Sequence, residues 1–343
     1  MNIYQILRPL LFSLDAETAH GLTLALLNAT YNLGLTKFLY PEILDKPVVV
    51  MGINFKNPVG LAAGLDKNGD HLDALAAMGF GFIEIGTVTP KAQLGNPKPR
   101  MFRLPEYQAI INRMGFNNKG IDHLLRQVQQ SQNQGVIGIN IGKNADTPIE
   151  NAVDDYLIGL RKAYSLASYI TINISSPNTQ NLRQLQQGDE LKKLFTLIKE
   201  EQLKLTQQHG CYVPLVLKIA PDLNTDELHH IAQLLLAFAI DGVIATNTTI
   251  ARDKVAGHTL ASETGGLSGA PVKLKATEVV RCLATELNGK IPIIAAGGIM
   301  NADDAQEKLD AGASLLQIYS GLVYRGPGLL AEIVKQTKLT ALV

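Results

Sequence analysis

Residues 173–179, which read NISSPNT, place amide and hydroxyl side chains directly after the apolar run SYITI. Such a run is typical of a buried strand, so these polar groups lie where a strand ends. The hydroxyls of Ser175, Ser176 and Thr179 are weak bases, and the segment contains no histidine or carboxylate to activate them. The segment is therefore either a turn or a catalytic loop whose base depends on groups elsewhere.

The ends of the other apolar runs have the same chemical character. Lysines, amides, hydroxyls and small residues predominate there, without histidine or cysteine. Because the usual nitrogen and sulfur ligands are missing, we expect no metal centre. The residues at these ends are Ala62, Ala63, Gly64, Lys67, Thr87, Asn140, Asn173, Ser176, Asn178, Lys218, Thr246, Asn247, Thr248, Gly297, Gly298, Tyr319, Ser320 and Gly321.

Glycine-rich segments indicate a phosphate site. AAGGI follows the seventh apolar run, YSG follows the eighth, and TGGLSG occupies residues 264–269. Small residues let backbone N–H groups approach phosphate oxygens. Each Gly-Gly pair taken alone is equally consistent with a tight turn.

Two lysines and four asparagines extend this chemistry. Lys67 and Lys218 each end or follow an apolar run, where a charge is costly unless it meets an anion or a polar ligand, although the side chain can also extend to solvent. A cation beside a redox ring would stabilise its reduced, anionic form. The carboxamides match a planar ligand with alternating N–H and C=O edges, whereas a single asparagine is more often a turn or cap residue. These four are Asn112, Asn173, Asn178 and Asn247.

Eight short apolar runs must position these residues. Helical patterns follow most of them, for instance over residues 70–78, 190–208, 226–238 and 302–311. This repetition predicts an α/β fold, a (β/α)8 TIM barrel, in which loops at the carboxyl ends of the strands form the site. A doubly wound open sheet is the alternative, but no GxGxxG follows the first strand.

Three further segments interrupt the repetition. A hairpin with its turn at Gly52-Ile53-Asn54 is predicted before the first barrel strand, where it could close the barrel floor. Residues 90–118 and 249–276 are long insertions on the site face, the first with a hairpin around Leu104-Pro105-Glu106.

Residues 1–40 are predicted to form a separate helical region before a catalytic domain of residues 41–343. Leucines and isoleucines recur at helical spacing up to Leu14, Asp15 is a candidate N-cap, and a second helix continues to Gly34. The two helices either pack on the main domain or lie in a bilayer surface and admit an apolar ligand. No run reaches the roughly 18 apolar residues of a spanning helix.

Composition excludes several classes of protein. Lysine plus arginine equals aspartate plus glutamate, 31 each, so the whole chain has no electrostatic footprint for nucleic acid. Cys211 and Cys282 are too far apart for a metal motif, and a reducing cytosolic compartment is expected.

Taken together, the motifs resemble the class 2 dihydroorotate dehydrogenases, which are membrane-associated and quinone-linked. The resemblance covers essentially the whole chain and rests on GLAAGLDKNG, EIGTVTPKAQLGNPKPRMFRL, INRMGFNN, NISSPNTQNLR, LKIAPDL, ATNTT, GGLSG, IAAGGI and QIYSGLVYRGPGL. It implies oxidation of (S)-dihydroorotate to orotate in pyrimidine biosynthesis, with one non-covalent FMN and electrons passed to ubiquinone or menaquinone. It also implies a monomer, peripheral on the cytoplasmic face of a bacterial inner membrane.

The resemblance also assigns residues. The FMN phosphate would lie at Gly269, Gly298, Tyr319 and Ser320, and the rest of the cofactor at Ala63, Gly64, Lys67, Thr87, Asn140, Asn173, Lys218 and Thr246. Substrate would meet Lys67, Asn112, Arg113, Met114, Gly115, Phe116, Asn173, Asn178, Asn247 and Thr248.

Ser176 matches the family's catalytic base, with Lys67 and a relay through Thr179 as helpers. The soluble class 1 enzymes have cysteine there, so serine favours class 2. A quinone tunnel beside the helices is implied, with His20 and Arg103 at its polar end, although His20 is equally consistent with a core histidine. The alternatives are another flavin barrel, such as a class 1 enzyme, and an inactive flavin-binding barrel.

Overall fold

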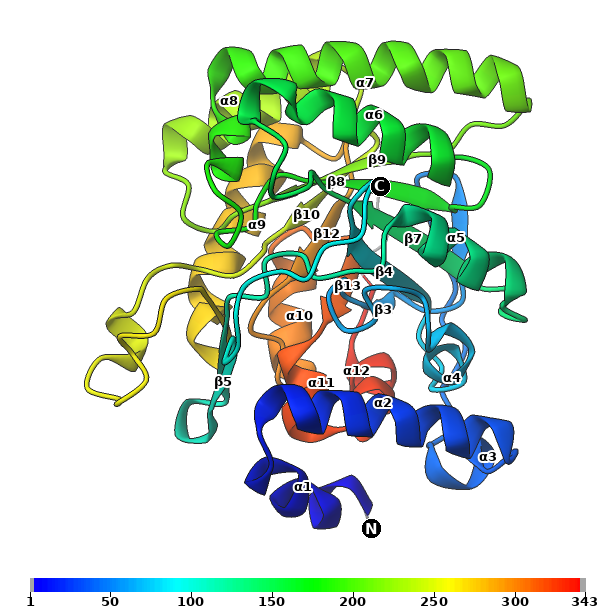
Figure 1. Cartoon of the computed structure of the whole chain (residues 1–343), viewed down its shortest axis with the longest axis vertical. Helices are drawn as coiled ribbons and strands as arrows, with labels where there is room; N and C mark the ends of the chain where they lie inside the picture. Colours follow the sequence, from blue (N-terminus) through cyan, green and yellow to red (C-terminus); the bar gives the residue numbers. More distant parts are fainter. Residues whose placement is uncertain (1–2, 340–343) are drawn as a thin grey trace.

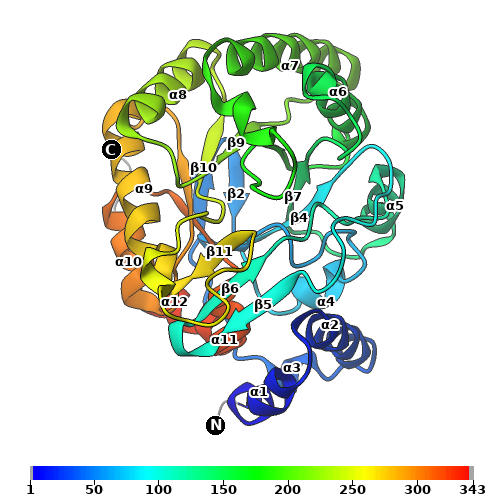
Figure 2. The ribbon, with the colours of Figure 1, turned by 60° about the vertical axis from the view of Figure 1, so that its left-hand side comes forward.

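A closed barrel of parallel strands forms the centre of the molecule (Figures 1 and 2). The structure is a computed structural model that describes residues 3–339. Within these residues the barrel has eight strands, each hydrogen-bonded to the next in chain order, and the last pairs with the first. The (β/α)8 prediction is therefore confirmed, and the doubly wound alternative is wrong. The strands are β3 (Val59–Leu61), β4 (Phe82–Val88), β7 (Val136–Ile141), β8 (Tyr169–Asn173), β9 (Leu215–Ile219), β10 (Gly242–Ala245), β12 (Ile293–Ala296) and β13 (Leu315–Ile318).

Helices surround the barrel as an outer ring (Figure 2). All four helical patterns predicted from the sequence are confirmed to within three residues at either end. A capping box at Asn224 and Glu227 starts α8 and satisfies two otherwise free backbone N–H groups. The helices are α4 (Leu72–Ala76), α5 (Ile121–Gln130), α6 (Ala152–Ala163), α7 (Gly188–His209), α8 (Thr225–Ala237), α9 (Lys273–Leu287), α10 (Ala302–Asp310), α11 (Ser320–Arg325) and α12 (Gly328–Gln336). Single 3-10 turns lie at η2 (Ile149–Asn151), η3 (Leu182–Gln186), η4 (Asp253–Val255) and η5 (Ala270–Val272).

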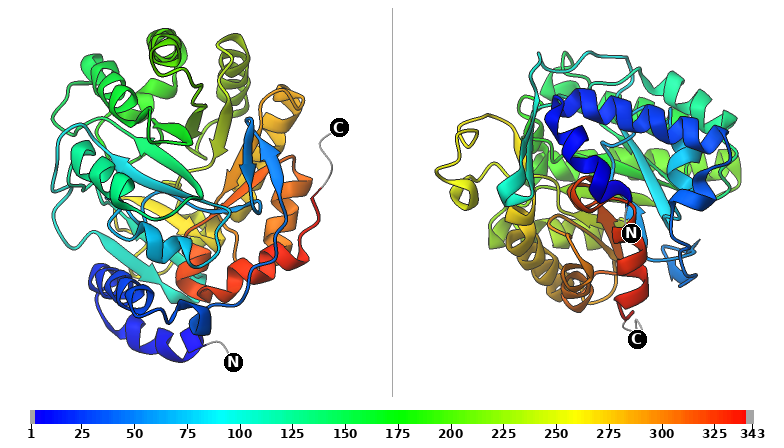
Figure 3. Two further views of the ribbon diagram at one scale, coloured as in Figure 1. Left: turned by 90° about the vertical axis from the view of Figure 1, so that its right-hand side faces the viewer. Right: turned by 90° about the horizontal axis from the view of Figure 1, so that it is seen from below.

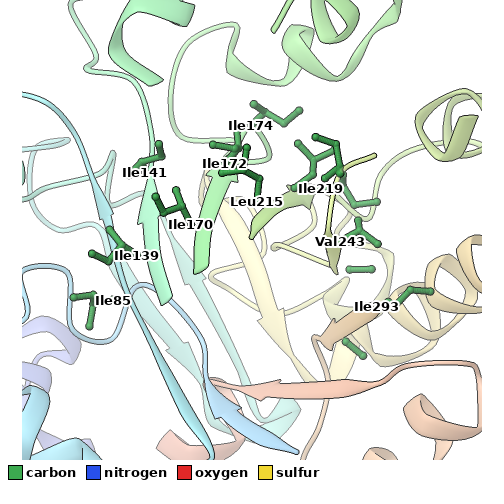
Figure 4. Packing of buried hydrophobic residues seen from close by; sticks show 14 of the residues in the cluster. Ile85, Ile139, Ile141, Ile170, Ile172, Ile174, Leu215, Ile219, Val243 and Ile293 are labelled. Atoms are coloured by element: carbon green, nitrogen blue, oxygen red, sulfur yellow. The ribbon is translucent and has the colours of Figure 1, made fainter. Parts of the chain in front are cut away.

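The main core lies between strands and helices (Figure 4). Side chains such as Ile139, Ile170 and Leu215 are wholly buried there. Each fully buried side chain of this size contributes about 1.5–3 kcal/mol relative to exposure. Since the strands are buried on both faces, they read as continuous apolar runs, which is why the sequence located them.

A hairpin closes the floor of the barrel, as predicted. It consists of β1 (Val48–Val50) and β2 (Ile53–Phe55), and the Phe55 ring meets Phe82 edge to face inside the barrel. The predicted turn position was wrong. Ile53 and Asn54 pair within the strand, and the turn is formed by Met51 and Gly52, with φ of 54° and 73°. Positive φ at both positions gives a two-residue turn whose twist matches that of the strands.

The two long insertions form one antiparallel sheet beside the barrel mouth. The predicted hairpin is confirmed as β5 (Met101–Leu104), η1 (Pro105–Tyr107) and β6 (Ala109–Asn112). The second insertion supplies β11 (Gly266–Gly269), which pairs with β6 so that Gly266 is opposite Asn112. The sequence did not predict this pairing, which joins residues about 150 positions apart.

The N-terminal helices lie against the outside of the barrel, beside α11 and α12 (Figures 1 and 3). They are α1 (Ile3–Ser13), α2 (Ala16–Asn32) and a short α3 (Thr36–Leu39) that was not predicted. Asp15 caps α2, as predicted, because its carboxylate accepts hydrogen bonds from the N–H groups of Glu17 and Thr18. Arg8 ties α1 to the barrel by donating to the Tyr324 carbonyl oxygen at 2.9 Å.

Candidate active site

A single cavity opens at the carboxyl ends of the barrel strands, and we call it the mouth cavity. The long βα loops and the sheet β5-β6-β11 form its walls, so residues far apart in sequence converge on it. Most residues singled out by the sequence line it: Ala63, Gly64, Lys67, Thr87, Asn112, Met114, Gly115, Phe116, Asn173, Ser176, Asn178, Lys218, Thr246, Asn247, Thr248, Gly269, Gly298, Tyr319 and Ser320.

Three predicted residues are not among the lining. The wholly buried Asn140 lies beneath the cavity, where its Oδ1 accepts hydrogen bonds from Thr87 Oγ1 at 2.5 Å and Asn173 Nδ2 at 3.2 Å. Thr179 is buried, and its carbonyl accepts the N–H of Leu182.

Arg113 was predicted to bind substrate, but it lies away from the cavity. Its guanidinium forms an ion pair with Glu263 at 2.5 Å and stacks over the Phe102 ring, 4.6 Å from the centroid. Neighbouring residues on an extended chain point to opposite sides, so Asn112 faces the cavity while Arg113 does not.

A buried carboxylate that the sequence analysis missed organises the cavity floor. Glu84, on β4, is wholly buried and accepts hydrogen bonds from Tyr169, Thr171, Asn140 and Gln317 at 2.8–3.1 Å. Its position inside the run FGFIEIG was the available signal, since a buried charge needs partners.

Lys218 is the charge partner of Glu84. Its Nζ lies 3.7 Å from Glu84 Oε1, and its side chain is only 7% exposed. Burial lowers the pKa of Lys218, while the neighbouring carboxylate opposes that shift. The pair thus holds a cation at the cavity surface, beside Thr246 and Asn173.

The asparagines are held in fixed orientations. Asn173 Nδ2 donates to Thr87 Oγ1 at 2.8 Å, and Asn247 Nδ2 donates to Ser175 Oγ at 2.9 Å. Asn178 Nδ2 reaches the Asn112 carbonyl oxygen at 3.1 Å, joining the β8 loop to the side sheet. Amide edges held in this way are preorganised to recognise a planar polar ligand.

Ser176 is buried in the cavity wall. Its Oγ accepts a hydrogen bond from the N–H of Asn178 at 3.2 Å. Lys67, which lines the same cavity, donates to the Gly64 carbonyl oxygen at 2.9 Å, and burial together with the Arg100 charge lowers the pKa of Lys67 to about 8. The cavity therefore contains a cation that titrates near neutral pH.

The glycine segments line the mouth cavity with backbone, and at two of them neighbouring backbone leaves no room for a side chain. A Cβ at Gly269 would lie 2.1 Å from the Gln108 carbonyl oxygen, and one at Gly298 would lie 2.3 Å from Lys273 Cα. Nearby, Ser320 Oγ donates to Ser268 Oγ at 2.9 Å. Gln317, which also lines this cavity, has a buried Oε1 without a hydrogen-bond partner among residues 3–339. Glycine loops, hydroxyls and a free acceptor match the donor and acceptor set of a flavin nucleotide.

A second cavity, the helix cavity, lies between α1, α2 and the barrel. Its wall is mainly apolar, and both His20 and Arg103 line it, as does Tyr319, which also lines the mouth cavity. Burial lowers the pKa of His20 to about 4, so its imidazole is neutral near pH 7. Arg103 donates to the carbonyl oxygens of Leu11 and Leu14.

The match to known proteins extends over nearly the whole chain. The dihydroorotate dehydrogenase family model matches residues 47–340. Proteins named dihydroorotate dehydrogenase (quinone) from Chromobacterium violaceum and Thiobacillus denitrificans are 63% and 62% identical, over 98% and 97% of this chain and 97% and 99% of theirs. The crystal structure of DHODH from Eimeria tenella in complex with ferulenol matches with a TM-score of 0.85 and 39% identity, covering 93% of this chain and 90% of that one.

These relatives favour the quinone-dependent class over the soluble class and over an inactive barrel. The barrel, the serine in the β8 loop and the N-terminal helices are consistent with that class. The chain therefore belongs to the dihydroorotate dehydrogenase family, as a quinone-dependent member that oxidises dihydroorotate.

Proposed function

We propose that the mouth cavity binds FMN non-covalently and dihydroorotate above it. The observation that carries this proposal is the combination, in one cavity, of the glycine segments, the Lys218–Glu84 pair and the asparagine edges. The phosphate would lie against Gly269, Gly298, Tyr319 and Ser320. Lys218, Thr246, Thr87, Asn173, Ala63 and Gly64 would hold the ring and ribityl chain, with Asn140 acting from beneath.

When bound, FMN supplies a two-electron acceptor that takes hydride from dihydroorotate. Lys218 offers a positive charge where negative charge develops, and Glu84 holds that lysine in place. The Lys218 stem and the Glu84 hydrogen bonds are fixed before substrate arrives, so little reorganisation is needed.

The substrate site consists of Lys67, Asn112, Asn178, Asn247 and Thr248, together with Asn173 and the segment Met114, Gly115 and Phe116. Dihydroorotate is an anion with amide edges, which suits a lysine charge and carboxamide donors and acceptors. Ser176 Oγ takes the proton from C5 as general base while its own hydroxyl proton passes on towards Thr179 or solvent. The Lys67 charge in the same cavity favours loss of the C5 proton, and Thr179 relays a proton only if its hydroxyl reaches the cavity during turnover.

The helix cavity would admit the quinone. Tyr319 borders both cavities, so an acceptor there would be one side chain away from the flavin site. His20 and Arg103 are the polar groups available to a quinone carbonyl. Within residues 3–339, no helix combines the length and the apolar character needed to cross a bilayer. Peripheral attachment is supported by exposed apolar side chains on the helical region, including Leu10, Leu33 and Phe38, which are 68%, 72% and 83% exposed.

We place the monomer on the cytoplasmic face of a bacterial inner membrane. Flotation with anionic-lipid vesicles tests the attachment: Leu10→Glu with Phe38→Glu should abolish binding, and Val49→Glu, at a side chain 63% exposed on the barrel floor, should not. Equal binding by the wild type, the double variant and Val49→Glu would contradict membrane attachment through these helices.

Anaerobic mixing with dihydroorotate tests the cofactor and substrate together. Bleaching of the flavin absorbance, followed by reoxidation with ubiquinone but not with fumarate or NAD, is the expected result. A bound flavin that stays oxidised would contradict the assignment of the substrate site. A purified protein without flavin would contradict the cofactor assignment.

A further inference from the structure

A partly buried ion pair joins the N-terminal helices to the loop behind the wall of the mouth cavity. Glu17, in the first turn of α2, accepts two hydrogen bonds from Arg100, at 2.7 Å from Nη2 and 3.1 Å from Nε. The side chains are 17% and 8% exposed. Bidentate geometry and burial separate this pair from the usual surface ion pair, which contributes little.

Arg100 uses its remaining donors on the loop that precedes β5. Its Nη1 donates to the carbonyl oxygens of Leu94 at 2.6 Å and Asn96 at 2.9 Å. Its own carbonyl accepts the N–H of Arg113 at 2.9 Å. The guanidinium therefore fixes the loop relative to α2, and the main-chain carbonyl of Arg100 links it to the residue that follows β6.

This loop in turn supports residues that line the cavity. Asn96 N donates to the Met114 carbonyl at 3.1 Å, and Gln93 Nε2 donates to the Gly115 carbonyl at 2.9 Å. A Cβ at Gly95 would lie 2.2 Å from the Met114 carbonyl oxygen, so the loop and the wall are already in close contact. Movement of the loop would therefore move Met114 and Gly115.

The same pair acts electrostatically on Lys67. Arg100 lowers the pKa of Lys67, whereas Glu17 raises it, so the carboxylate partly offsets the arginine charge. The Arg100 guanidinium also lowers the pKa of Glu17, which keeps the carboxylate ionised. The position of the wall and the charge of the lysine thus both depend on Glu17.

We propose that Glu17 and Arg100 are positioning residues for dihydroorotate, so that the helical region which meets the quinone also shapes the substrate site. The inference rests on the substrate site proposed above. Neither residue lines either cavity, so both act through other groups.

The test is Glu17→Gln in the full-length protein with FMN bound, assayed for flavin reduction by dihydroorotate. We expect the Kd for dihydroorotate to rise about tenfold with the limiting reduction rate within about twofold, the scale of a typical coupling between sites. Lys98→Met is the matched control, because Lys98 also meets Glu17, at 3.5 Å, but is 68% exposed. It should leave the Kd unchanged.

Further variants distinguish a failure of this inference from a failure of the proposed substrate site. Glu17→Asp should recover part of the affinity, because it restores the charge. An unchanged Kd in Glu17→Gln, or a rise confined to the KM for quinone, would overturn the inference. Loss of FMN from Glu17→Gln would overturn it as well. So would a loss of unfolding free energy as large as the loss of binding free energy, because both results would indicate a purely structural role. Asn178→Ala reports on the substrate site itself: if it too leaves the Kd unchanged, the proposed site is wrong.

Discussion

The mouth cavity and the helix cavity share Tyr319 but are built by different physical means. In the mouth cavity, charged and amide side chains are fixed by hydrogen bonds to one another, and the network reaches down to Glu84. In the helix cavity, apolar side chains from α1, α2, β5, β6 and the C-terminal helices pack together with few polar groups. The first arrangement is rigid and intolerant of isosteric change, and the second depends mainly on packing that can readjust.

The largest effect is expected at Ser176, the proposed general base. Ser176→Ala should lower the limiting rate of flavin reduction by about 10³-fold or more, since general base catalysis contributes on this order. FMN should stay bound, because the Ser176 hydroxyl bonds only to the Asn178 N–H among the described residues. Stopped-flow absorbance measures both. A reduction rate in Ser176→Ala close to wild type would exclude Ser176 as the base.

The buried ion pair between Glu84 and Lys218, at the floor of the mouth cavity, should be costly to break. Glu84→Gln leaves the Lys218 charge buried without its partner, and this typically destabilises a protein by about 3–5 kcal/mol. Denaturant unfolding measures the change. Glu84→Gln combined with Lys218→Met should be less destabilised than the sum of the two single variants. Additive losses would mean that the pair is not coupled, and the contrast between the cavities would weaken.

In the helix cavity, removing a polar side chain should affect only the half-reaction with quinone. Arg103→Met should raise the KM for quinone about tenfold, the loss expected for a charged hydrogen-bond donor. Flavin reduction by dihydroorotate should stay within about twofold of wild type. Arg103→Lys keeps a charge and should be milder. Equal slowing of both half-reactions would show that Arg103 acts by supporting the fold, through its hydrogen bonds to Leu11 and Leu14.

Substrate binding should weaken as pH rises, because Lys67 loses its charge. Its pKa is about 8 in the protein without substrate, lowered by burial and by Arg100. The ammonium is present below this pH and is lost above it, so the Kd for the dihydroorotate anion should rise about tenfold between about pH 7 and pH 9 if only the charged form binds. Lys67→Arg stays charged throughout and should give a flat profile. A wild-type profile that is equally flat would contradict the role given to Lys67.

The sequence located the mouth cavity well because strand ends are visible as a change from apolar to polar residues. Asn173, Lys218 and Thr246 could be placed in this way. Glu84 and Gln317 lie within apolar runs, where the pattern does not reveal which side chain faces the barrel interior. Arg113 adjoins Asn112 in a motif, yet its side chain pairs with Glu263 and is not among the residues that line the cavity.

The helix cavity was harder to predict, because its walls meet only in three dimensions. The helical spacing indicated an apolar face on α1 and α2, and the resemblance indicated His20 and Arg103, which do line one cavity. Neither signal showed that Glu17 would pair with Arg100, 83 residues away. Local pattern fixes an element and its exposed face, whereas long-range pairing depends on packing.

The smallest effect is expected when a helix N-cap is removed, and the same change can be made in the helical region and in the barrel. Asp15 caps α2 and Asn224 caps α8, each by accepting backbone N–H groups, and Ala at either position should cost about 1 kcal/mol. In the barrel this loss should lower the global midpoint of unfolding, because α8 packs within the main core. In the helical region, Asp15→Ala should instead speed amide exchange only in α1 and α2, since these helices have few buried side chains. Hydrogen-exchange mass spectrometry with denaturant unfolding distinguishes the two results. If Asp15→Ala lowers the global midpoint as much as Asn224→Ala does, the helices unfold together with the barrel, and the flexible-versus-rigid contrast between the two cavities does not hold.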